Sequence, residues 1–379
     1  MPRPAPYKKG DAVIRRHTDL YPQIYDFENL FTAYRQARLS KRYRREVLEF
    51  TRNLEENLIT IQNELMWRTY QVGRYREFFV HEPKKRLIMA LPFRDRVVQW
   101  AIYRVLNPIL ERRYIMDSYA CRVGYGTHRA ADRLQCWLRY LARRHPRMYA
   151  LKLDISKYFY RVDHDILLKI LGRIIKDRDL MWLLETIVRA EGAKFGLVLG
   201  DHFFEQERVA NCGMPIGNLT SQMIANLYLN ELDQYAKHTL KARHYIRYMD
   251  DAVILHPDKR YLWTLKDEIQ GFVETQLRLV LNNKTTVQAT NQGVDFCGYR
   301  IWPTHRLLRK IAAKKMRRRL RYLQRAYARG EVSLETTHAS VQSYMGLLKH
   351  CDSYNLRQKL FGNLVFVREM RCFHAAHHP

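Results

Sequence analysis

Three aspartates have the residue type and setting needed to hold metal ions for phosphoryl transfer. Asp250 and Asp251 are adjacent within the apolar segment 245–255, and Asp154 lies near the end of the apolar segment 149–155. Adjacent carboxylates repel each other and lose hydration when they are partly enclosed, so a divalent cation beside them stabilises the fold. Oxygen ligands select hard ions such as Mg²⁺. If the two segments lie side by side in a sheet, the three carboxylates converge on one edge, which is the layout of a two-metal site.

The same residues also allow a plainer interpretation. Asp-Asp is an ordinary turn pair, and a Tyr–apolar–Asp–Asp string arises by chance in roughly one chain of this length in a hundred. Asp154 alone carries little information. The elements that flank the three aspartates therefore decide between a turn pair and a metal site.

Hydrophobic patterning predicts those elements. Segment 245–255 predicts two strands that meet at a tight acidic turn, and segment 149–155 predicts a buried strand. A hairpin is expected from 75–80 and 86–91, and a further strand at 296–302. Helices are expected at about 47–65, 94–106 (ending before Pro108), 156–191, 219–236 and 314–329. Helix-rich ends around a central sheet indicate the α+β class.

The charge of the chain indicates a polyanionic partner. Lys and Arg total 66 against 38 acidic residues, which gives a net charge of +28. Nucleic acid is the leading candidate, because each phosphate contact releases condensed counterions. A membrane surface is the weaker alternative, and the sequence has neither a run of some 18 apolar residues nor a signal peptide. Six cysteines without a Cys-x-x-Cys pair indicate reduced thiols and a cytoplasmic protein. Residues 1–25 are basic and contain prolines, so we expect them to form an arm that is ordered only on a partner.

Several short motifs occur in the order in which reverse transcriptases carry them. Tyr248-Met249-Asp250-Asp251 resembles the catalytic turn of that family, and residues 154–164 (DISKYFYRVDH) resemble its first catalytic motif. Residues 213–226, with GMPIG, SQ and AN, resemble the dNTP-binding loop and its helix. Residues 281–284 (LNNK) resemble the lysine motif, and Phe296-Cys297-Gly298-Tyr299 resembles the primer grip. On these motifs the chain is identified as a member of the reverse transcriptase family.

The resemblance implies a right-hand polymerase that copies RNA into DNA. Residues 1–145 would supply the N-terminal arm, the fingers and the start of the palm. Residues 146–304 would form the palm, with an antiparallel sheet backed by helices, the catalytic aspartates and the primer grip. Residues 305–379 would form a basic helical thumb that follows the RNA–cDNA duplex.

Details of the motifs are similar to the reverse transcriptases of diversity-generating retroelements. Most intron-type enzymes read Pro-Gln-Gly and then Ser-Pro in the dNTP loop, whereas this chain has Ile216 and Gln222 at the Gln and second Pro positions. Segments 118–128 and 294–310 strengthen this likeness. It implies error-prone copying of a template-repeat RNA, with substitutions at template adenines, and a small, basic, oligomeric accessory protein. Residues 1–25 and 194–208 match no motif.

The resemblance also implies roles for single residues. Asp154, Asp250, Asp251 and the carbonyl of Ile155 would hold two Mg²⁺ ions, with Mn²⁺ as an alternative ion. Phe159 would exclude a ribose 2′-hydroxyl; its alternative is a place in the palm core, as we expect for Tyr158. The expected dNTP contacts are Arg86, Phe159, Ile216, Gly217, Gln222 and Lys284. The expected contacts with the nucleic-acid backbone are Arg309, Lys310, Lys314, Lys315, Arg317 and Arg318.

Each of these roles has a structural alternative. Ile216 could simply pack in the core, Lys284 could be a surface lysine, and Lys84 and Lys85 could belong to a solvated basic hairpin. Other functions also remain open: an intron, retron or phage-defence reverse transcriptase, or, in a different class, a non-catalytic RNA-binding scaffold. Intron enzymes usually carry a maturase segment and often an endonuclease beyond the thumb, and the residues after 304 are too few for both.

Overall fold

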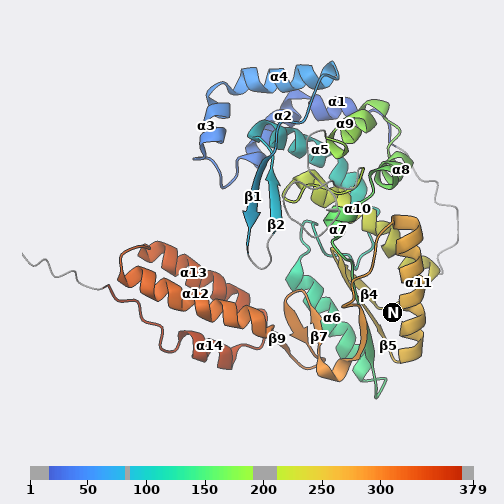
Figure 1. Cartoon of the computed structure of the whole chain (residues 1–379), viewed down its shortest axis with the longest axis vertical. Coiled ribbons are helices and arrows are strands. Elements are labelled where there is room, and N and C mark those ends of the chain that lie inside the picture. Colours follow the sequence, from blue (N-terminus) through green and yellow to red (C-terminus); the bar gives the residue numbers. More distant parts are fainter. Residues whose placement is uncertain (1–16, 82–85, 191–210, 369–379) are drawn as a thin grey trace, which may run out of the picture. The chain divides into compact units, whose positions relative to one another are not determined.

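Two compact units make up the chain, and each is assembled from separate stretches of sequence. Figure 1 shows a computed structural model that describes residues 17–81, 86–190 and 211–368. The first unit comprises Met1–Met116, Ile155–Thr239 and Glu268–Asn282, and the second comprises Asp117–Asp154, Leu240–Asp267 and Asn283–Pro379. Several sequence predictions lie outside the described residues: residues 1–16 of the basic arm, Lys84 and Lys85, the segment 194–208, and the side chain of Arg86.

The first unit is mainly helical. Its helices are α1 (Tyr21–Tyr25), α2 (Phe27–Ala37), α3 (Arg45–Arg52), α4 (Leu54–Met66), α5 (Phe93–Glu111), α7 (Tyr158–Arg161), α8 (His164–Ile174), α9 (Arg178–Val188), α10 (Leu219–Gln234) and the π-helical turn Tyr235–Thr239. α5 packs against α2 and α10. The predicted hairpin is confirmed as β1 (Arg76–Val80) paired with β2 (Arg86–Ala90). α11 (Lys259–Leu277) contributes residues to both units.

The second unit is built on a four-stranded antiparallel sheet with the order β4-β5-β3-β6. Its strands are β3 (Tyr149–Asp154), β4 (Tyr245–Tyr248), β5 (Asp251–His256) and β6 (Thr286–Ala289). Successive side chains of a strand alternate between the two faces. Ala150 and Val253 therefore face α6 (Thr127–Ala142), where they share a core with Leu134 and Leu138. Figure 1 shows α6 lying along this sheet.

A smaller sheet and a helical segment complete the second unit. After the 3₁₀ turn Thr290–Gln292, β7 (Val294–Phe296), β8 (Tyr299–Ile301) and β9 (Arg306–Leu308) pair antiparallel in that order. α12 (Lys310–Ala328), α13 (Leu334–Leu348) and α14 (Tyr354–Phe361) follow, and Met316, Leu320, Leu348 and Leu360 form a core among them. The prediction of a basic helix at 314–329 is thus confirmed, as are a mixed α and β composition and antiparallel sheets.

Three predicted helices differ from the observed ones. The one expected at 156–191 is divided into α7, α8 and α9, because Asp163 and Asp177 have extended backbones and cap new helices. The helix expected at 47–65 is broken at Asn53, because the side-chain amide of Asn57 donates to the carbonyl of Phe50 (3.0 Å) and so replaces a helical hydrogen bond. The helix expected to end before Pro108 continues to Glu111. Pro108 removes one backbone donor, but Leu106 and Leu110 on either side of it are fully buried, and their burial outweighs that loss.

The strand expected at 296–302 is confirmed only as β8 (Tyr299–Ile301), because the chain reverses at Cys297-Gly298. Cys297 and Gly298 form a two-residue loop between β7 and β8, with φ values of 47° and 86°. Two consecutive positive φ angles are typical of the tight turns that join antiparallel strands, and glycine favours them. Elsewhere, no helix in the described ranges is long and apolar enough to cross a membrane.

Candidate active site

The acidic turn connects two paired strands of the second unit. β4 ends at Tyr248 and β5 begins at Asp251, so Met249 and Asp250 form a two-residue hairpin loop. Met249 has a φ of 52°, a left-handed backbone conformation that residues other than glycine adopt at a cost of about 1 kcal/mol or more. The surrounding structure must therefore hold this turn.

The side chain of Arg247 supports the turn through a hydrogen bond. The sequence analysis gave this residue no role. Its side chain is 1% exposed and donates to the carbonyl of Met249 (3.0 Å) and to the hydroxyl of Ser118 (3.1 Å). Its backbone also bridges to the segment around Ser118. An arginine between Ile246 and Tyr248 in an apolar strand was the available signal, because a buried charge requires partners.

The strand pairing brings two of the three aspartates opposite each other. In the antiparallel register of β3 and β5, Asp154 faces Asp251. Opposite residues in such a pair have Cα atoms about 4.5–5.5 Å apart and side chains on the same face. Asp250 precedes Asp251 in the turn. The predicted adjacency of the two acidic segments is therefore confirmed.

Lys152 supplies a positive charge beside this pair. It lies two residues before Asp154 and so projects from the same face of β3. Its ammonium group is 3.6 Å from Oδ2 of Asp251 and donates to the carbonyl of Asp295 (3.0 Å) in β7. The sequence analysis missed Lys152 because nothing in a strand pattern reveals a diagonal neighbour on another strand.

Asp251 is electrostatically strained. Burial raises its pKa from 3.8 to about 6, against the opposing effect of Lys152, and Asp154 raises it further. Its Oδ1 atom is buried and accepts no hydrogen bond from the residues that the structure describes. A desolvated carboxylate oxygen without a partner, with two more carboxylates next to it in the strands and turn, fits a hard divalent cation. Within residues 17–81, 86–190 and 211–368, however, no three His, Cys, Asp or Glu side chains are already gathered into a metal site.

The raised pKa of Asp251 predicts how stability depends on pH. Folded Asp251 releases its proton near pH 6 and unfolded Asp251 near 3.8, so the free energy of unfolding of metal-free protein should fall as the pH rises between these values. Asp251→Asn should therefore stabilise the protein at neutral pH by up to about 3 kcal/mol and have little effect at about pH 4. Urea unfolding in EDTA at both pH values measures this. An equal effect of the substitution at both pH values would contradict it.

In the first unit, the predicted dNTP-binding loop is tied to the segment that carries Phe159. The N–H of Met214 donates to the carbonyl of Phe159 (2.7 Å), and that of Gly213 to the carbonyl of Val162 (2.7 Å). The carbonyl of Ile216 accepts from Met89 of β2 (3.3 Å). Gly217 has a φ of 118°, which favours glycine. Phe159 and Ile216 are both half-buried, whereas Tyr158 is buried, as expected.

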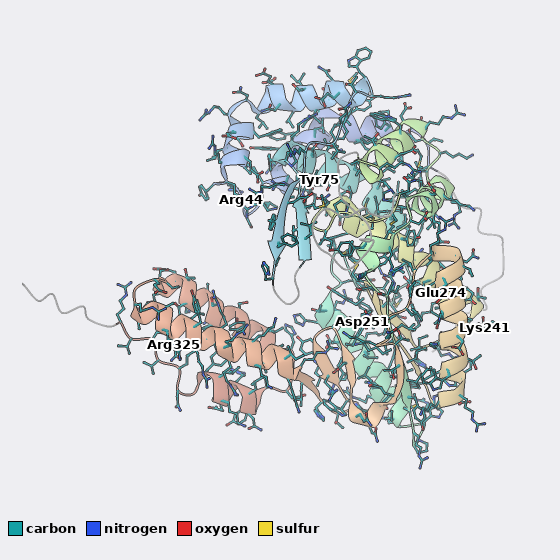
Figure 2. The ribbon with its side chains drawn as sticks, viewed as in Figure 1. Arg44, Tyr75, Lys241, Asp251, Glu274 and Arg325 are labelled. Carbon is teal, nitrogen blue, oxygen red and sulfur yellow. The ribbon has the colours of Figure 1, made fainter. Side chains whose placement is uncertain are left out.

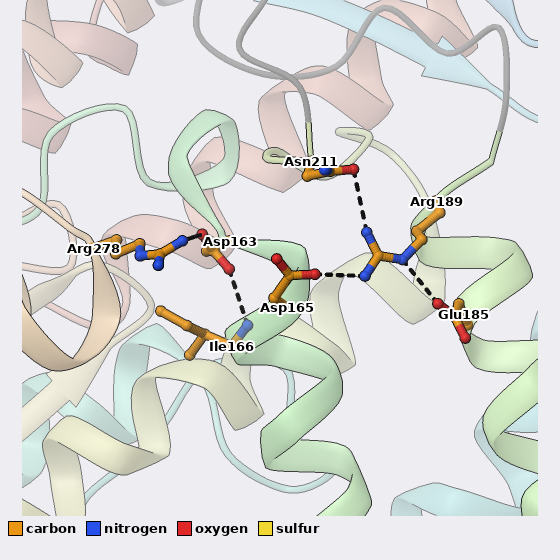
Figure 3. Close-up of polar contacts among 7 residues, drawn as sticks. All are labelled: Asp163, Asp165, Ile166, Glu185, Arg189, Asn211 and Arg278. Atoms are coloured by element: carbon orange, nitrogen blue, oxygen red, sulfur yellow. Dashed lines mark hydrogen bonds and ion pairs between the residues drawn. The ribbon is translucent and has the colours of Figure 1, made fainter.

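A polar network fixes the start of this loop and was also missed (Figure 3). Arg189 donates to Asn211 (3.2 Å), Glu185 (3.0 Å) and Asp165 (2.5 Å). Asp163 caps α8 through the N–H of Ile166 and accepts from Arg278 (2.6 Å).

The ring of His164 contacts the loop next to this network. Its Nε2 lies 2.7 Å from the carbonyl of Gly213, and burial lowers its pKa. A histidine kept neutral by burial acts as a fixed hydrogen-bond partner. The start of the loop, at Asn211 and Gly213, is thus held by hydrogen bonds with Arg189 and His164.

The remaining predicted residues are spread over both units. Gln222 is exposed on α10, and Lys284 is exposed after Asn283. Phe296 and Tyr299 are buried in the core beneath α6, so the turn Cys297-Gly298 is the accessible part of the expected primer grip. Arg309 lies 3.7 Å from Asp295 and lowers the pKa of Asp251, so it faces the acidic strands.

α12 carries a row of cations, of which Figure 2 labels Arg325. The groove along it is lined by Lys314, Arg317, Arg318, Arg321, Tyr322, Arg325 and Arg329. These positions recur three or four residues apart, which places them on one side of a helix. Of the other predicted backbone contacts, Lys310 is exposed and Lys315 is half-buried.

Comparison with known families decides the chemistry. The family described as reverse transcriptase (RNA-dependent DNA polymerase) matches residues 81–301, more than half of the chain. The chain belongs to this reverse transcriptase family. This reverse transcriptase is 29% identical to Protein YkfC of Escherichia coli (strain K12) over 68% of its own length and 72% of that protein. It is 20% identical to the putative COX1/OXI3 intron 2 protein of Saccharomyces cerevisiae over 54% of its length, but spans only 29% of that relative.

Solved structures that align with part of this chain include telomerases. The telomerase of Candida albicans, in complex with a fragment of telomeric RNA, aligns with 79% of this chain and 58% of its own chain, at 12% identity and a TM-score of 0.44. The apo telomerase of Candida tropicalis aligns with 66% of this chain and 60% of its own chain, at 15% identity and the same TM-score. The chain therefore spans about three fifths of these structures.

Proposed function

We propose that this RNA-directed DNA polymerase copies a template-repeat RNA into cDNA by two-metal nucleotidyl transfer, with errors at template adenines. The two-metal mechanism is supported by the position of Asp154, which lies opposite Asp251 in the paired strands β3 and β5. The buried Oδ1 of Asp251, which has no hydrogen-bond partner among the described residues, supports it further. The error-prone part rests on the motif variant at Ile216 and Gln222.

The three aspartates and the carbonyl of Ile155 would hold the metal ions. Mg²⁺, or Mn²⁺ in its place, would activate the primer 3′-hydroxyl and stabilise the leaving pyrophosphate when bound. Lys152 keeps a counter-charge beside Asp251 and so limits the repulsion among the carboxylates. The Met249 turn and Arg247 orient Asp250 and Asp251.

The substrate contacts follow the same proposal. Phe159 excludes a ribose 2′-hydroxyl, Arg86 and Lys284 neutralise the triphosphate, and Ile216, Gly217 and Gln222 line the nucleotide. The turn Cys297-Gly298 steadies the primer strand, and the basic face of α12 contacts the duplex backbone without sequence preference. These roles correspond to fingers in residues 1–145, a palm in 146–304 and a thumb in 305–379.

The fidelity prediction concerns Ile216. Its apolar side chain makes no hydrogen bond to a substrate, so a mispaired nucleotide gives up less binding energy than it would beside a Gln. We expect Ile216→Gln to reduce misincorporation opposite template adenines by about tenfold, the factor that corresponds to one hydrogen bond. The measurement is primer extension on an adenine-containing RNA template, followed by sequencing of the cDNA.

Two results would decide against the mutagenic assignment. Faithful wild-type cDNA would remove it, and an unchanged error spectrum in Ile216→Gln would remove the role of this residue. Val287→Ile, a conservative change in β6, serves as the control and should leave the spectrum as it is.

An intron-encoded reverse transcriptase is the second candidate. It is favoured by the names of relatives: besides the yeast intron 2 protein, nuclear intron maturase 2 of Arabidopsis thaliana is 30% identical over 93 residues, 20% of this chain and 13% of that protein. A small basic oligomeric accessory protein and a cytoplasmic location belong to the first candidate. Stimulation of cDNA synthesis by spliced-intron RNA, and not by a template-repeat RNA, would favour the second.

A further inference from the structure

The second unit has a basic surface at the end of its sheet that is remote from the aspartates. β3 runs from Tyr149 to Asp154, so the two ends of the strand are about 17 Å apart. At the Tyr149 end, this strand pairs with His256 of β5 and Ala289 of β6. The surface near that end is termed the basic edge, and its cations are Arg139, Arg143, Arg144, Arg147, Lys241, Arg243, Lys259 and Arg260.

A chain of contacts brings these segments together. The ring of His244 lies 5.4 Å from that of Trp137 and 6.5 Å from that of Tyr140 on α6. The hydroxyl of Tyr261 donates to the carbonyl of Leu240 (3.5 Å), and its ring lies 4.2 Å from that of His256. The end of α6, the segment before β4 and the start of α11 therefore meet at the basic edge.

Half of the cations of the basic edge lack an acidic partner among the described residues. In the described part of the chain, Arg143, Arg144, Arg147 and Lys241 (Figure 2) form no ion pair, and all four are exposed. Asp258 is the acidic residue among 139–149, 240–248 and 252–261, and its carboxylate accepts from the backbone N–H groups at the start of α11. Unpaired cations of one sign destabilise the folded chain by mutual repulsion, and a polyanion relieves it.

One part of the basic edge has the form of a base-stacking platform. The guanidinium of Arg144 lies 3.7 Å from the centroid of the Tyr140 ring, and Tyr140 is 47% exposed. Single-stranded RNA is bound through unstacked bases that stack on aromatic rings and on guanidinium planes, whereas duplexes offer mainly their backbone. A membrane surface would need a cluster of exposed apolar side chains among the cations, whereas the exposed large ones of the described α6 and the first turns of α11 are two aromatic residues, Tyr140 and Trp263.

We propose that the basic edge binds single-stranded template RNA outside the duplex being copied. This inference rests on the polymerase activity of the family, since an enzyme that copies RNA holds a strand that continues beyond the copied stretch. The flanking strand is tethered at the active site, so its effective concentration at a second surface is high and modest contacts suffice. The basic edge would then keep a template bound between rounds of copying.

The test compares two fluorescein-labelled probes by anisotropy without dNTPs. One is a 12-base-pair RNA–DNA primer-template, and the other carries an added tail of 25 uridines at either end of the template strand. Wild type should bind the tailed probe about tenfold more tightly in at least one of the two orientations. The triple variant Arg143→Gln, Arg144→Gln and Arg147→Gln should lose this gain, and the slope of log affinity against log salt should fall by about 2. Gln avoids placing new negative charge at the C-terminus of α6.

Binding and extension of the short probe should stay within about twofold of wild type in this variant, because the basic edge lies at the other end of β3. A matched variant, Lys169→Gln, Lys176→Gln and Arg178→Gln, removes three exposed cations of α8, α9 and the segment between them, and should keep the gain.

The proposal is overturned if wild type shows no gain, if the triple variant keeps it, or if both variants lose it equally. Loss of short-probe extension together with the gain would also overturn it, since the residues would then act in the active site or in folding. Preferential binding of wild type to vesicles with 30% phosphatidylserine, without a gain from the tail, would instead assign the surface to membranes. The polymerase assignment is judged separately, by extension of the short probe by wild type.

Discussion

Asp154→Asn, Asp250→Asn and Asp251→Asn should each slow primer extension on an RNA template by about a thousandfold or more. Each change keeps the size of the side chain and removes one negative charge. Loss of about 4 kcal/mol of stabilisation of the reacting phosphate in the transition state corresponds to that factor. Asp154 and Asp251 face each other across the strands and Asp250 adjoins them, so the three variants should fail alike.

Single-turnover extension with Mg²⁺ and saturating dNTPs measures this effect. Asp267→Asn is the control, because it makes the same chemical change at an exposed position of α11 in the same unit. The Asn variants should unfold no more easily than wild type, and Asp251→Asn should be more stable at neutral pH. A rate within tenfold of wild type in any of the three would remove that aspartate from the catalytic set.

Arg247→Met should lower the free energy of unfolding by about 3 kcal/mol, because hydrogen bonds from a charged group contribute about 1.5–3 kcal/mol each. The substitution removes this donor from the half-buried Met249 carbonyl and from the buried Ser118 hydroxyl. It also releases the left-handed conformation of Met249, so Asp250 and Asp251 lose their fixed orientation. We therefore expect extension to fall at least tenfold even where the variant is folded.

Urea unfolding followed by circular dichroism measures the stability, and extension is assayed well below the melting temperature of the variant. Arg300→Met in β8 is the control, because Arg300 is exposed and its ion pair with Asp295 contributes less than about 1 kcal/mol. If Arg247→Met unfolds like Arg300→Met, the buried guanidinium does not support the turn. Arg247→Lys keeps the charge without the planar donors, so its free energy of unfolding should lie between those of Arg247→Met and Arg300→Met.

The sequence predicted those parts of the site that depend on local pattern. The apolar segments around Asp154 and Asp251 are regular enough to predict strands. The two acidic residues between apolar segments predicted the turn of a hairpin. The break at Asn53 and the turn at Cys297-Gly298 lie inside patterns that continue undisturbed on both sides. They depend on a single side-chain hydrogen bond and on two backbone angles, which periodicity does not report.

The supporting residues of the site were harder to predict. Lys152, Arg247 and His164 each act on a group far away in the chain or around a turn: Asp251, Met249 and Gly213. A lysine or arginine inside an apolar strand signals that a partner exists but does not say which one. Pairing partners of this kind emerge only when the register of the strands is known.

The central place of β3 in its sheet has a consequence for how the protein is made. Both strands that flank it, β5 and β6, are synthesised later, and β5 begins about a hundred residues after β3 ends. At 5–20 residues per second, the nascent β3 waits about 5–20 s for its first neighbour. Throughout that time an apolar strand has two open edges, each able to pair with another nascent chain. Poor yield on rapid overexpression would thus arise from the same strand that carries Asp154.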